Sequence, residues 1–151
     1  MPIAISKDKI YLSSEKQTEE LAIKLLAKIK RGYILFFYGE MGVGKTTFIR
    51  YLINGFQNKI GANLTEVTSP TFNLMNEYQI DKLKIKHFDL FRLNSEKELK
   101  NLDIFEENTQ TITLVEWPQL IKKKPENLIE LFFNYEEDHQ KRSVQVKGLD
   151  F

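Results

Sequence analysis

The hydrophobic pattern at the start of the chain predicts a short strand followed by a helix. Lys9–Leu12 is a candidate strand, and apolar residues from Leu21 to Ile29 then recur at the spacing of one helix face. Ser14 is suited to cap the start of this helix, because Gln17 follows three residues later and completes a capping box. Gly32 follows the last apolar position as a stop signal.

A second helix is predicted after a buried strand. The run Tyr33–Tyr38 is short, continuous and rich in aromatic and branched apolar residues, which favours a strand over a helical turn. The run ends at Gly39, and from Lys45 to about Phe56 the apolar residues again gather on one side of a helix. A strand, a glycine-rich turn and a helix in this order are typical of the opening of an α/β unit.

The rest of the chain is dominated by strand patterns. Phe72–Ile80 and Leu83–Leu90 flank a polar dipeptide and predict a hairpin. Ser95 and Glu98 form a second capping box, which predicts a short helix reaching Leu102. Further strand candidates are Thr111–Val115, Leu128–Tyr135 and Arg142–Val146. We therefore predict one domain over residues 1–151, an α/β three-layer sandwich built on a mixed parallel and antiparallel sheet.

Composition is typical of a soluble globular protein and excludes several kinds of site. Hydrophobic residues make up 42% and charged residues 28% of the chain, so disorder is not expected. The 22 basic and 21 acidic residues leave a net charge of +1, which is too little to favour DNA or direct tRNA binding. The lack of cysteine excludes disulfides, zinc–thiolate sites and cysteine nucleophiles. No apolar run approaches a membrane span of about 20 residues, and residues 1–10 lack a secretory signal, so we expect a cytoplasmic protein without a membrane partner.

Residues 39–46, Gly-Glu-Met-Gly-Val-Gly-Lys-Thr, match the phosphate-binding motif G-x-x-x-x-G-K-[ST] in full. Its glycines let backbone N–H groups turn inward around a polyphosphate, and the following helix points its positive end at the same anion. Lys45 is expected to reach the β- and γ-phosphates, and Thr46 to place its hydroxyl on Mg²⁺. The alternative is an ordinary glycine-rich turn with a surface lysine. The position between a predicted strand and a predicted helix favours the phosphate loop, and with it a P-loop NTPase-like form of the sandwich.

Two carboxylates are candidate partners for the metal, because each ends a predicted strand. Glu116 follows the apolar run that ends at Val115, and Asp89 follows the run that ends at Phe88. The usual residue at such a strand end is Asp, so Glu116 is a departure with a longer arm. The simpler interpretation of Glu116 is a solvated strand-end carboxylate. For Asp89 it is a cap or a salt bridge with Arg92.

Three further features that lie near these positions could contribute to a site. The segment Ser69-Pro-Thr71-Phe carries hydroxyls that can sense a γ-phosphate, as switch loops do, although the residues alone favour a plain proline turn. His87 lies in a strand pattern far from the second histidine, so a metal site built on it is not expected. Trp117 follows Glu116 directly, and is either an ordinary half-buried aromatic or a ring that closes over a nucleotide.

Four strings in this order resemble the TsaE family, the small P-loop ATPases of bacterial tRNA threonylcarbamoyladenosine biosynthesis. They are the loop at residues 39–46, SPTF at 69–72 with NEY at 76–78, HFDLFRL at 87–93 and LVEWP at 114–118. The resemblance covers about Ile10 to Gly148, which is nearly the whole chain. The loop is shared by many families, whereas the other three strings are much more specific.

The resemblance implies a Mg²⁺-dependent ATPase that binds ATP or ADP, is weak alone and is promoted by a TsaB–TsaD partner complex. Hydrolysis would support threonylcarbamoyl transfer to the adenosine beside the anticodon, with tRNA contacted only indirectly. The residues that fall on the phosphate-binding loop are Gly42, Val43, Gly44, Lys45, Thr46 and Thr47. Thr46 and Glu116 fall on the metal positions. Asp89 falls on an acidic position with an expected catalytic or metal-linked role, and Thr71 falls on the switch-like loop.

Weaker matches and departures complete the comparison. Thr18 and Arg142 resemble family positions near the nucleotide, but the matching stretches are short. The family usually has Tyr where this chain has Phe91, which removes a hydroxyl and keeps the ring. The run Lys122–Lys124 is interpreted as a solvated face, with a contact for tRNA or an acidic partner as the alternative.

Two other functions compete with the ATPase subunit. The main alternative is a small-molecule P-loop kinase, which must bind a second substrate and clamp the phosphoryl group, often with several arginines. The arginines of this chain are scattered, and no arginine-rich lid segment is evident; they are Arg31, Arg50, Arg92 and Arg142. The third interpretation is a nucleotide-gated binding module with negligible turnover. The intact set of phosphate and metal residues argues against a dead site.

Overall fold

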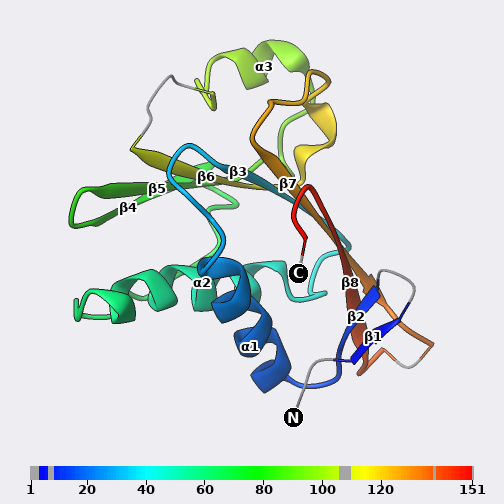
Figure 1. Ribbon diagram of the computed structural model, residues 1–151. Helices are drawn as coiled ribbons and strands as arrows, with labels where there is room; N and C mark the ends of the chain where they lie inside the picture. The colour runs from blue at the N-terminus through cyan, green and yellow to red at the C-terminus, as the bar shows by residue number, and fades with distance from the viewer. Residues whose placement is uncertain (1–3, 7–8, 106–109, 138, 151) are drawn as a thin grey trace.

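One mixed sheet is the centre of the computed structural model of the chain, which describes residues 4–6, 9–105, 110–137 and 139–150 (Figure 1). The described residues form eight strands in the spatial order β1-β2-β8-β7-β3-β6-β5-β4. These strands are β1 (Ala4–Ser6), β2 (Lys9–Leu12), β3 (Ile34–Tyr38), β4 (Met75–Ile80), β5 (Leu83–Asp89), β6 (Thr111–Glu116), β7 (Leu128–Tyr135) and β8 (Arg142–Lys147). The neighbours β7, β3, β6 and β5 pair in parallel, and the outer pairs are antiparallel.

Helices cover both faces of the sheet, unequally. The helices are α1 (Glu15–Leu26), α2 (Lys45–Lys59), α3 (Glu96–Lys100) and the 3₁₀ turn η1 (Pro118–Leu120). Figure 1 shows α1 and α2 below the sheet and the short α3 above it. The larger apolar core lies between the sheet and α1 and α2, and a smaller one lies on the opposite face. The structure therefore confirms a three-layer α/β sandwich with a mixed sheet, one outer layer of which is thin.

The central strand β3 shows how the sequence builds these layers. Successive side chains of a strand point to opposite faces of the sheet. Leu35 and Phe37 are fully buried in the larger core, and Phe36 is fully buried in the smaller one. A strand covered on both faces needs a continuous apolar run, which is the pattern of residues 33–38.

Local structure departs from the predictions at a few element ends. Helix α1 ends at Leu26, and Ile29 is buried in the turn that follows. Ser14 caps this helix as expected by accepting a hydrogen bond from the Gln17 N–H at 3.3 Å, but the Gln17 side chain accepts from Ser13 rather than from Ser14. Strand β1 was not predicted. The structure thus confirms the predicted helices and strands with shifted ends.

The first strand of the predicted hairpin begins later than expected. Strand β4 starts at Met75, and residue Phe72 is 83% exposed. Leu74 has a φ of 68°, a left-handed conformation that an apolar residue rarely adopts, and its N–H donates to the Pro70 carbonyl. The turn at Pro70–Leu74 therefore takes up the residues that were predicted to begin the strand, and β4 starts directly after it.

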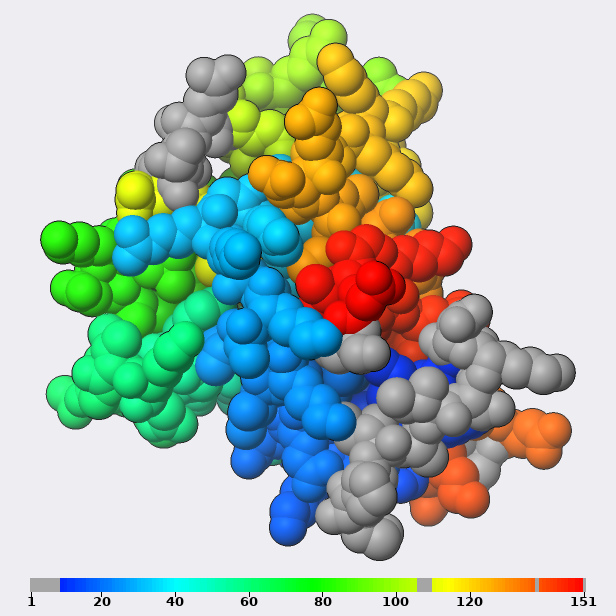
Figure 2. All heavy atoms as spheres, in the orientation of Figure 1, coloured from blue at the N-terminus to red at the C-terminus, as the bar shows by residue number. Residues whose placement is uncertain are grey.

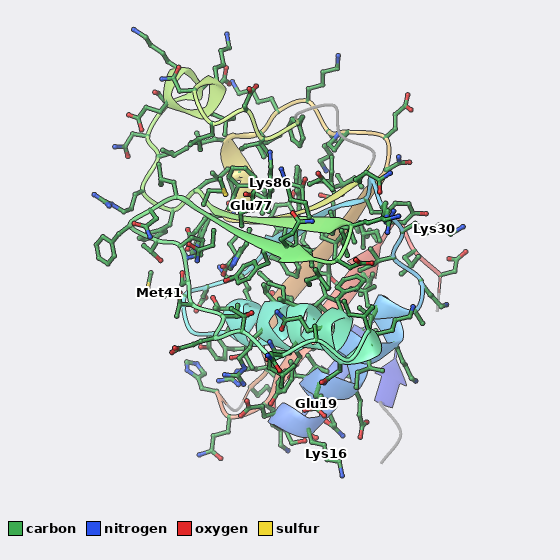
Figure 3. All side chains as sticks on the ribbon, turned by 90° about the vertical axis from the view of Figure 1, so that its left-hand side faces the viewer. Lys16, Glu19, Lys30, Met41, Glu77 and Lys86 are labelled. Carbon is green, nitrogen blue, oxygen red and sulfur yellow. The ribbon has the colours of Figure 1, made fainter. Side chains whose placement is uncertain are left out.

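The glycine-rich loop lies at one end of the molecule. Figure 3 shows Met41 of this loop and Lys30, which follows α1, at opposite ends. In Figure 2 the connection from α1 to β3, in light blue, forms part of the face of the molecule that is toward the viewer. Among the described residues, every helix is too short or too polar to cross a bilayer.

Candidate active site

The glycine-rich loop connects β3 to α2 at the carboxyl edge of the parallel strands. Gly39, the first residue after β3, has a φ of 146°, and a Cβ atom there would lie 2.8 Å from the Phe133 carbonyl oxygen. Only glycine fits this position without a shift of the backbone. Because the backbones at Gly39 and Phe133 lie so close together, the loop leaves the sheet at a defined point. The N-terminus of α2 is thereby placed at the carboxyl edge of the parallel strands.

Strand register brings both candidate carboxylates to the same edge. Asp89 pairs with Glu116 at the ends of the parallel strands β5 and β6, and Glu116 pairs with Phe37 of β3 on its other side. The carboxylates therefore stand side by side next to the loop that follows β3. Both are buried, with residue exposures of 4% for Asp89 and 2% for Glu116, so the interpretation of Glu116 as a solvated carboxylate is wrong.

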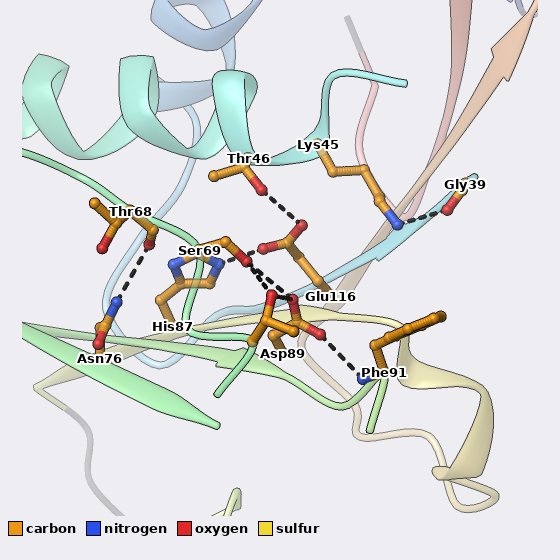
Figure 4. A network of polar contacts seen from close by, with 11 residues as sticks. Gly39, Lys45, Thr46, Thr68, Ser69, Asn76, His87, Asp89, Phe91 and Glu116 are labelled. Carbon is orange, nitrogen blue, oxygen red and sulfur yellow. Dashed lines mark hydrogen bonds and ion pairs between the residues drawn. The ribbon is translucent and has the colours of Figure 1, made fainter. Parts of the chain in front are cut away.

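Glu116 is held from two directions (Figure 4). Its Oε1 accepts a hydrogen bond from Thr46 Oγ1 at 3.0 Å, and its Oε2 lies 2.7 Å from His87 Nε2. Thr46 belongs to the first turn of α2, whereas His87 belongs to β5. The predicted partnership of Thr46 and Glu116 is thus present in the geometry of the protein.

Lys45 is buried at the same place, with 4% exposure. Its ammonium donates to the Gly39 carbonyl oxygen at 2.5 Å and lies 3.7 Å from the centroid of the Trp117 ring. Burial lowers the pKa of this ammonium, and the carboxylates of Glu116 and Asp89 partly offset the effect. Two carboxylates near one ammonium leave excess negative charge, which favours binding of a cation.

Asp89 accepts hydrogen bonds from the switch-like loop. Ser69 Oγ and Thr71 Oγ1 each lie 3.1 Å from Asp89 Oδ2 and 2.7 Å from each other, and the Phe91 N–H donates to Oδ1 at 3.0 Å. The predicted alternative, a salt bridge between Asp89 and Arg92, is not present among the described residues. The Arg92 guanidinium lies 5.2 Å from the Phe72 ring centroid instead.

These groups line one pocket of about 280 Å³. Its lining residues are Met41, Gly42, Gly44, Lys45, Thr46, Thr47, Ser69, Thr71, Asp89, Glu116 and Trp117. The structure therefore brings together the phosphate-loop residues, both strand-end carboxylates and the hydroxyls of the switch-like loop, Ser69 and Thr71. The backbone of Val43 belongs to the same loop, but its side chain is buried in the larger core.

The donor set of the pocket fits Mg²⁺. Thr46 Oγ1 and Glu116 Oε1 are 3.0 Å apart, and neighbouring ligands of an octahedral Mg²⁺ with bonds of about 2.0–2.1 Å are separated by about 2.9 Å. Oxygen atoms are the ligands that this ion prefers. In the described part of the chain, no three His, Asp or Glu side chains are arranged to hold a metal together. Further ligands would have to be phosphate oxygens and water.

Two predicted nucleotide residues lie outside this pocket. Arg142, at the start of β8, is nevertheless next to the loop, because a Cβ atom on Gly44 would lie 3.9 Å from its Cδ. Thr18 is half-buried in the first turns of α1, and its contact with a nucleotide stays a prediction. Lys122 and Lys124 form ion pairs with Glu96 and Glu130.

Sequence reasoning missed the partnership of His87 with Glu116. The signal was present, because His87 and Asp89 are two residues apart on one strand and must point to the same face. What the sequence lacked was the register that places Glu116 beside them.

The central strands of this mixed sheet are parallel, a phosphate-type loop follows β3, and helix α2 begins at that loop. With acidic residues at the ends of the neighbouring strands, these features define an α/β domain of the P-loop NTPase type. The sequence model of the family described as "Threonylcarbamoyl adenosine biosynthesis protein TsaE" matches residues 12–144. This chain belongs to the TsaE family.

Individual relatives agree with this assignment. The TsaE protein of Rickettsia bellii is 40% identical over 121 residues, which cover 80% of this chain and 81% of that protein. The TsaE protein of Aquifex aeolicus is 34% identical over 140 residues, with coverage of 91% and 93%. The crystal structure of Bacillus subtilis YdiB superposes with a TM-score of 0.68 at 27% identity and covers 91% of this chain and 82% of that one. Each of these three alignments covers 80% or more of this chain.

Proposed function

We propose that this protein is the Mg²⁺-dependent ATPase subunit of a tRNA threonylcarbamoyladenosine synthesis system. The observation that supports this most is the contact between Thr46 and Glu116 at 3.0 Å, beside the buried Lys45. It joins a phosphate loop to a metal-type carboxylate in one pocket. Membership of the TsaE family supports the biological setting, because relatives carry the name tRNA threonylcarbamoyladenosine biosynthesis protein.

Each residue of the pocket has a distinct task in this proposal. Lys45 leaves the Gly39 carbonyl to neutralise the β- and γ-phosphates of ATP, and backbone N–H groups of residues 42–47 bind phosphate oxygens. Thr46 and Glu116 would hold Mg²⁺, which would supply positive charge against the charge that develops on the phosphates during hydrolysis.

Asp89 is proposed to orient the attacking water. A carboxylate has about four acceptor positions, and three of those on Asp89 receive Ser69, Thr71 and the Phe91 N–H. The remaining position, on Oδ1, is proposed to accept a hydrogen bond from that water. Because Ser69 and Thr71 bind the other oxygen, the conformation of their loop is coupled to the orientation of Asp89.

The proposal assigns stimulation of the hydrolysis to a partner of the TsaB–TsaD type. In the described pocket, none of the four arginines of the chain is a lining residue. A kinase normally clamps the transferred phosphoryl group with such residues, so this pocket favours an ATPase that receives help from outside. The same proposal includes a cytoplasmic location and indirect contact with tRNA, without DNA or a membrane.

A reconstituted modification reaction tests the function. The purified chain, a TsaB–TsaD complex, tRNA, ATP and a threonylcarbamoyl donor are incubated, and modified adenosine is quantified by mass spectrometry of tRNA nucleosides. We expect many product molecules per complex with the wild-type chain, and no gain over the complex alone with Lys45→Ala. Equal yields with and without the chain would overturn the proposal. Appearance of the γ-phosphate on a small molecule would support the kinase.

A further inference from the structure

We propose that His87 is a positioning residue, which holds the Glu116 carboxylate so that Oε1 faces Thr46 and the metal position. This inference deepens the proposed function and rests on it, since it assigns the side chain that orients a Mg²⁺ ligand. The arrangement joins β5, β6 and the first turn of α2 through one carboxylate (Figure 4).

The geometry leaves Glu116 little freedom. His87 Nε2 lies 2.7 Å from Oε2, and Thr46 Oγ1 lies 3.0 Å from Oε1, so each carboxylate oxygen has its own donor. His87 is 0% exposed and Glu116 is 2% exposed, so water does not compete for the oxygen that His87 holds. A change at His87 therefore frees the carboxylate to rotate away from Thr46.

The surroundings of the imidazole assign its donated proton to Nε2. Nδ1 is buried and has no hydrogen-bond partner among the described residues. A proton on Nδ1 would therefore be a buried, unpaired donor, while the bare Nε2 would face a carboxylate oxygen. With the proton on Nε2, that nitrogen donates to the Glu116 carboxylate, and the only unpaired atom of the ring is the acceptor Nδ1.

A purely structural role explains the residue poorly. Ile85, which faces the same way two residues earlier on β5, is fully buried and apolar, and an apolar residue at position 87 would likewise avoid burying a polar ring. Burial of an imidazole is favourable here because it donates to a carboxylate. Partners that orient metal ligands in this way commonly change metal affinity about 10- to 100-fold when removed.

Two amide variants separate the positioning role from simple space filling. In His87→Gln the side-chain amide reaches the place of Nε2, whereas in His87→Asn it reaches only the place of Nδ1. The readout is binding of AMP-PNP, a non-hydrolysable ATP analogue, followed by the fluorescence of Trp117, the one tryptophan of the chain. Each variant is titrated with Mg²⁺ at saturating analogue, and its analogue affinity is also measured in EDTA.

We expect His87→Asn to weaken Mg²⁺ binding about 10- to 100-fold and His87→Gln to stay within about threefold of wild type. Analogue affinity in EDTA should be the same for all three proteins. Equal Mg²⁺ affinity of the two variants would overturn the positioning role. If the wild-type protein binds the analogue without any response to Mg²⁺, the proposed function fails instead.

The tautomer is a second and independent test. The chain has two histidines, so His139→Gln leaves His87 as the only imidazole for ¹H–¹⁵N NMR. We expect the His87 spectrum to show the proton on Nε2, in the free protein and without nucleotide. A proton on Nδ1 alone would overturn the inference, even if the position-87 variants failed to fold.

Discussion

Glu116, Asp89 and Lys45 are charged residues that the fold buries, and each is stabilised by a different kind of contact. A buried charge is costly unless it is paired or hydrogen-bonded. Glu116 forms hydrogen bonds with Thr46 and His87. Asp89 accepts hydrogen bonds from two hydroxyls and one backbone N–H, and Lys45 donates a hydrogen bond to a backbone carbonyl. Because no carboxylate forms a close ion pair with Lys45 in the described residues, its ammonium is available to a phosphate.

Replacement of Glu116 by Gln tests the metal role. The amide keeps the size of the side chain but removes the charge that attracts Mg²⁺, and its one oxygen can accept from either Thr46 or His87 but not from both. We expect a folded protein whose Mg²⁺ affinity in the presence of nucleotide falls at least about tenfold, the lower end of the range for altered metal ligation. Glu130→Gln is the matched control, because Glu130 is also buried but bonds Tyr38 and Lys124 outside the pocket. Equal effects of the two variants on Mg²⁺ affinity would contradict the assignment.

Replacement of Lys45 by Ala removes the cation that is proposed to bind the β- and γ-phosphates. Hydrogen bonds to charged groups contribute about 1.5–3 kcal/mol, so nucleotide affinity should fall about 10- to 100-fold. Isothermal titration with ATP measures the change directly. Lys59→Ala, at the far end of the same helix, should bind ATP like the wild type. Unchanged affinity and turnover in a folded Lys45→Ala protein would refute the phosphate-loop interpretation.

At the scale of elements, the loop from Ser69 to Leu74 connects the pocket to β4 and β5. Its hydroxyls bind Asp89, and the Leu74 carbonyl accepts the Asp89 N–H at 3.0 Å. One residue of β5 is therefore bonded to the loop through both its side chain and its backbone. A change of the loop on ATP binding would reach the carboxylate that is proposed to orient water.

We expect Thr71→Ala to blunt partner stimulation of the ATPase while sparing most nucleotide affinity, because the Thr71 hydroxyl hydrogen-bonds Ser69 and Asp89 rather than a described residue of the phosphate loop. Steady-state ATPase rates with and without a TsaB–TsaD complex measure stimulation, and titration with ATP measures affinity. Thr68→Ala serves as the control, since the Thr68 contact to Asn76 uses its backbone carbonyl. Full stimulation of Thr71→Ala would remove this loop from the coupling.

Gly39, where the phosphate loop leaves β3, is the subject of a prediction about folding stability. Gly39→Ala and Gly32→Ala both place a side chain at positive φ, with an expected cost of about 1–2 kcal/mol. Position 39 adds a contact of 2.8 Å with the Phe133 backbone, whereas position 32 has nothing within 4 Å. Urea unfolding should therefore show a larger loss of stability for Gly39→Ala. Equal losses would show that the backbones separate easily at this point.

For the whole molecule, the sequence predicted what depends on local pattern and missed what depends on register. The apolar periods of α1 and α2 and the continuous run of β3 are local, and the structure confirms them. Ile29 is buried although α1 ends at Leu26, so the apolar spacing continues beyond the end of the helix. The pairing of Asp89 with Glu116, and the contact of His87 with Glu116, depend on β5 lying beside β6, which no short segment encodes.

The proposed role of the whole protein as a partner-stimulated ATPase is tested most directly by its ATPase rate with and without a TsaB–TsaD complex. The pocket holds phosphate- and metal-type residues but no arginine among its described lining, and such a residue supplied by a partner is worth about 10³–10⁵ in rate. We therefore predict slow Mg²⁺-dependent hydrolysis by the chain alone and a strong acceleration by the complex, both abolished in Lys45→Ala. Fast hydrolysis by the chain alone, with no response to the complex, would contradict the account and favour an autonomous enzyme such as a kinase.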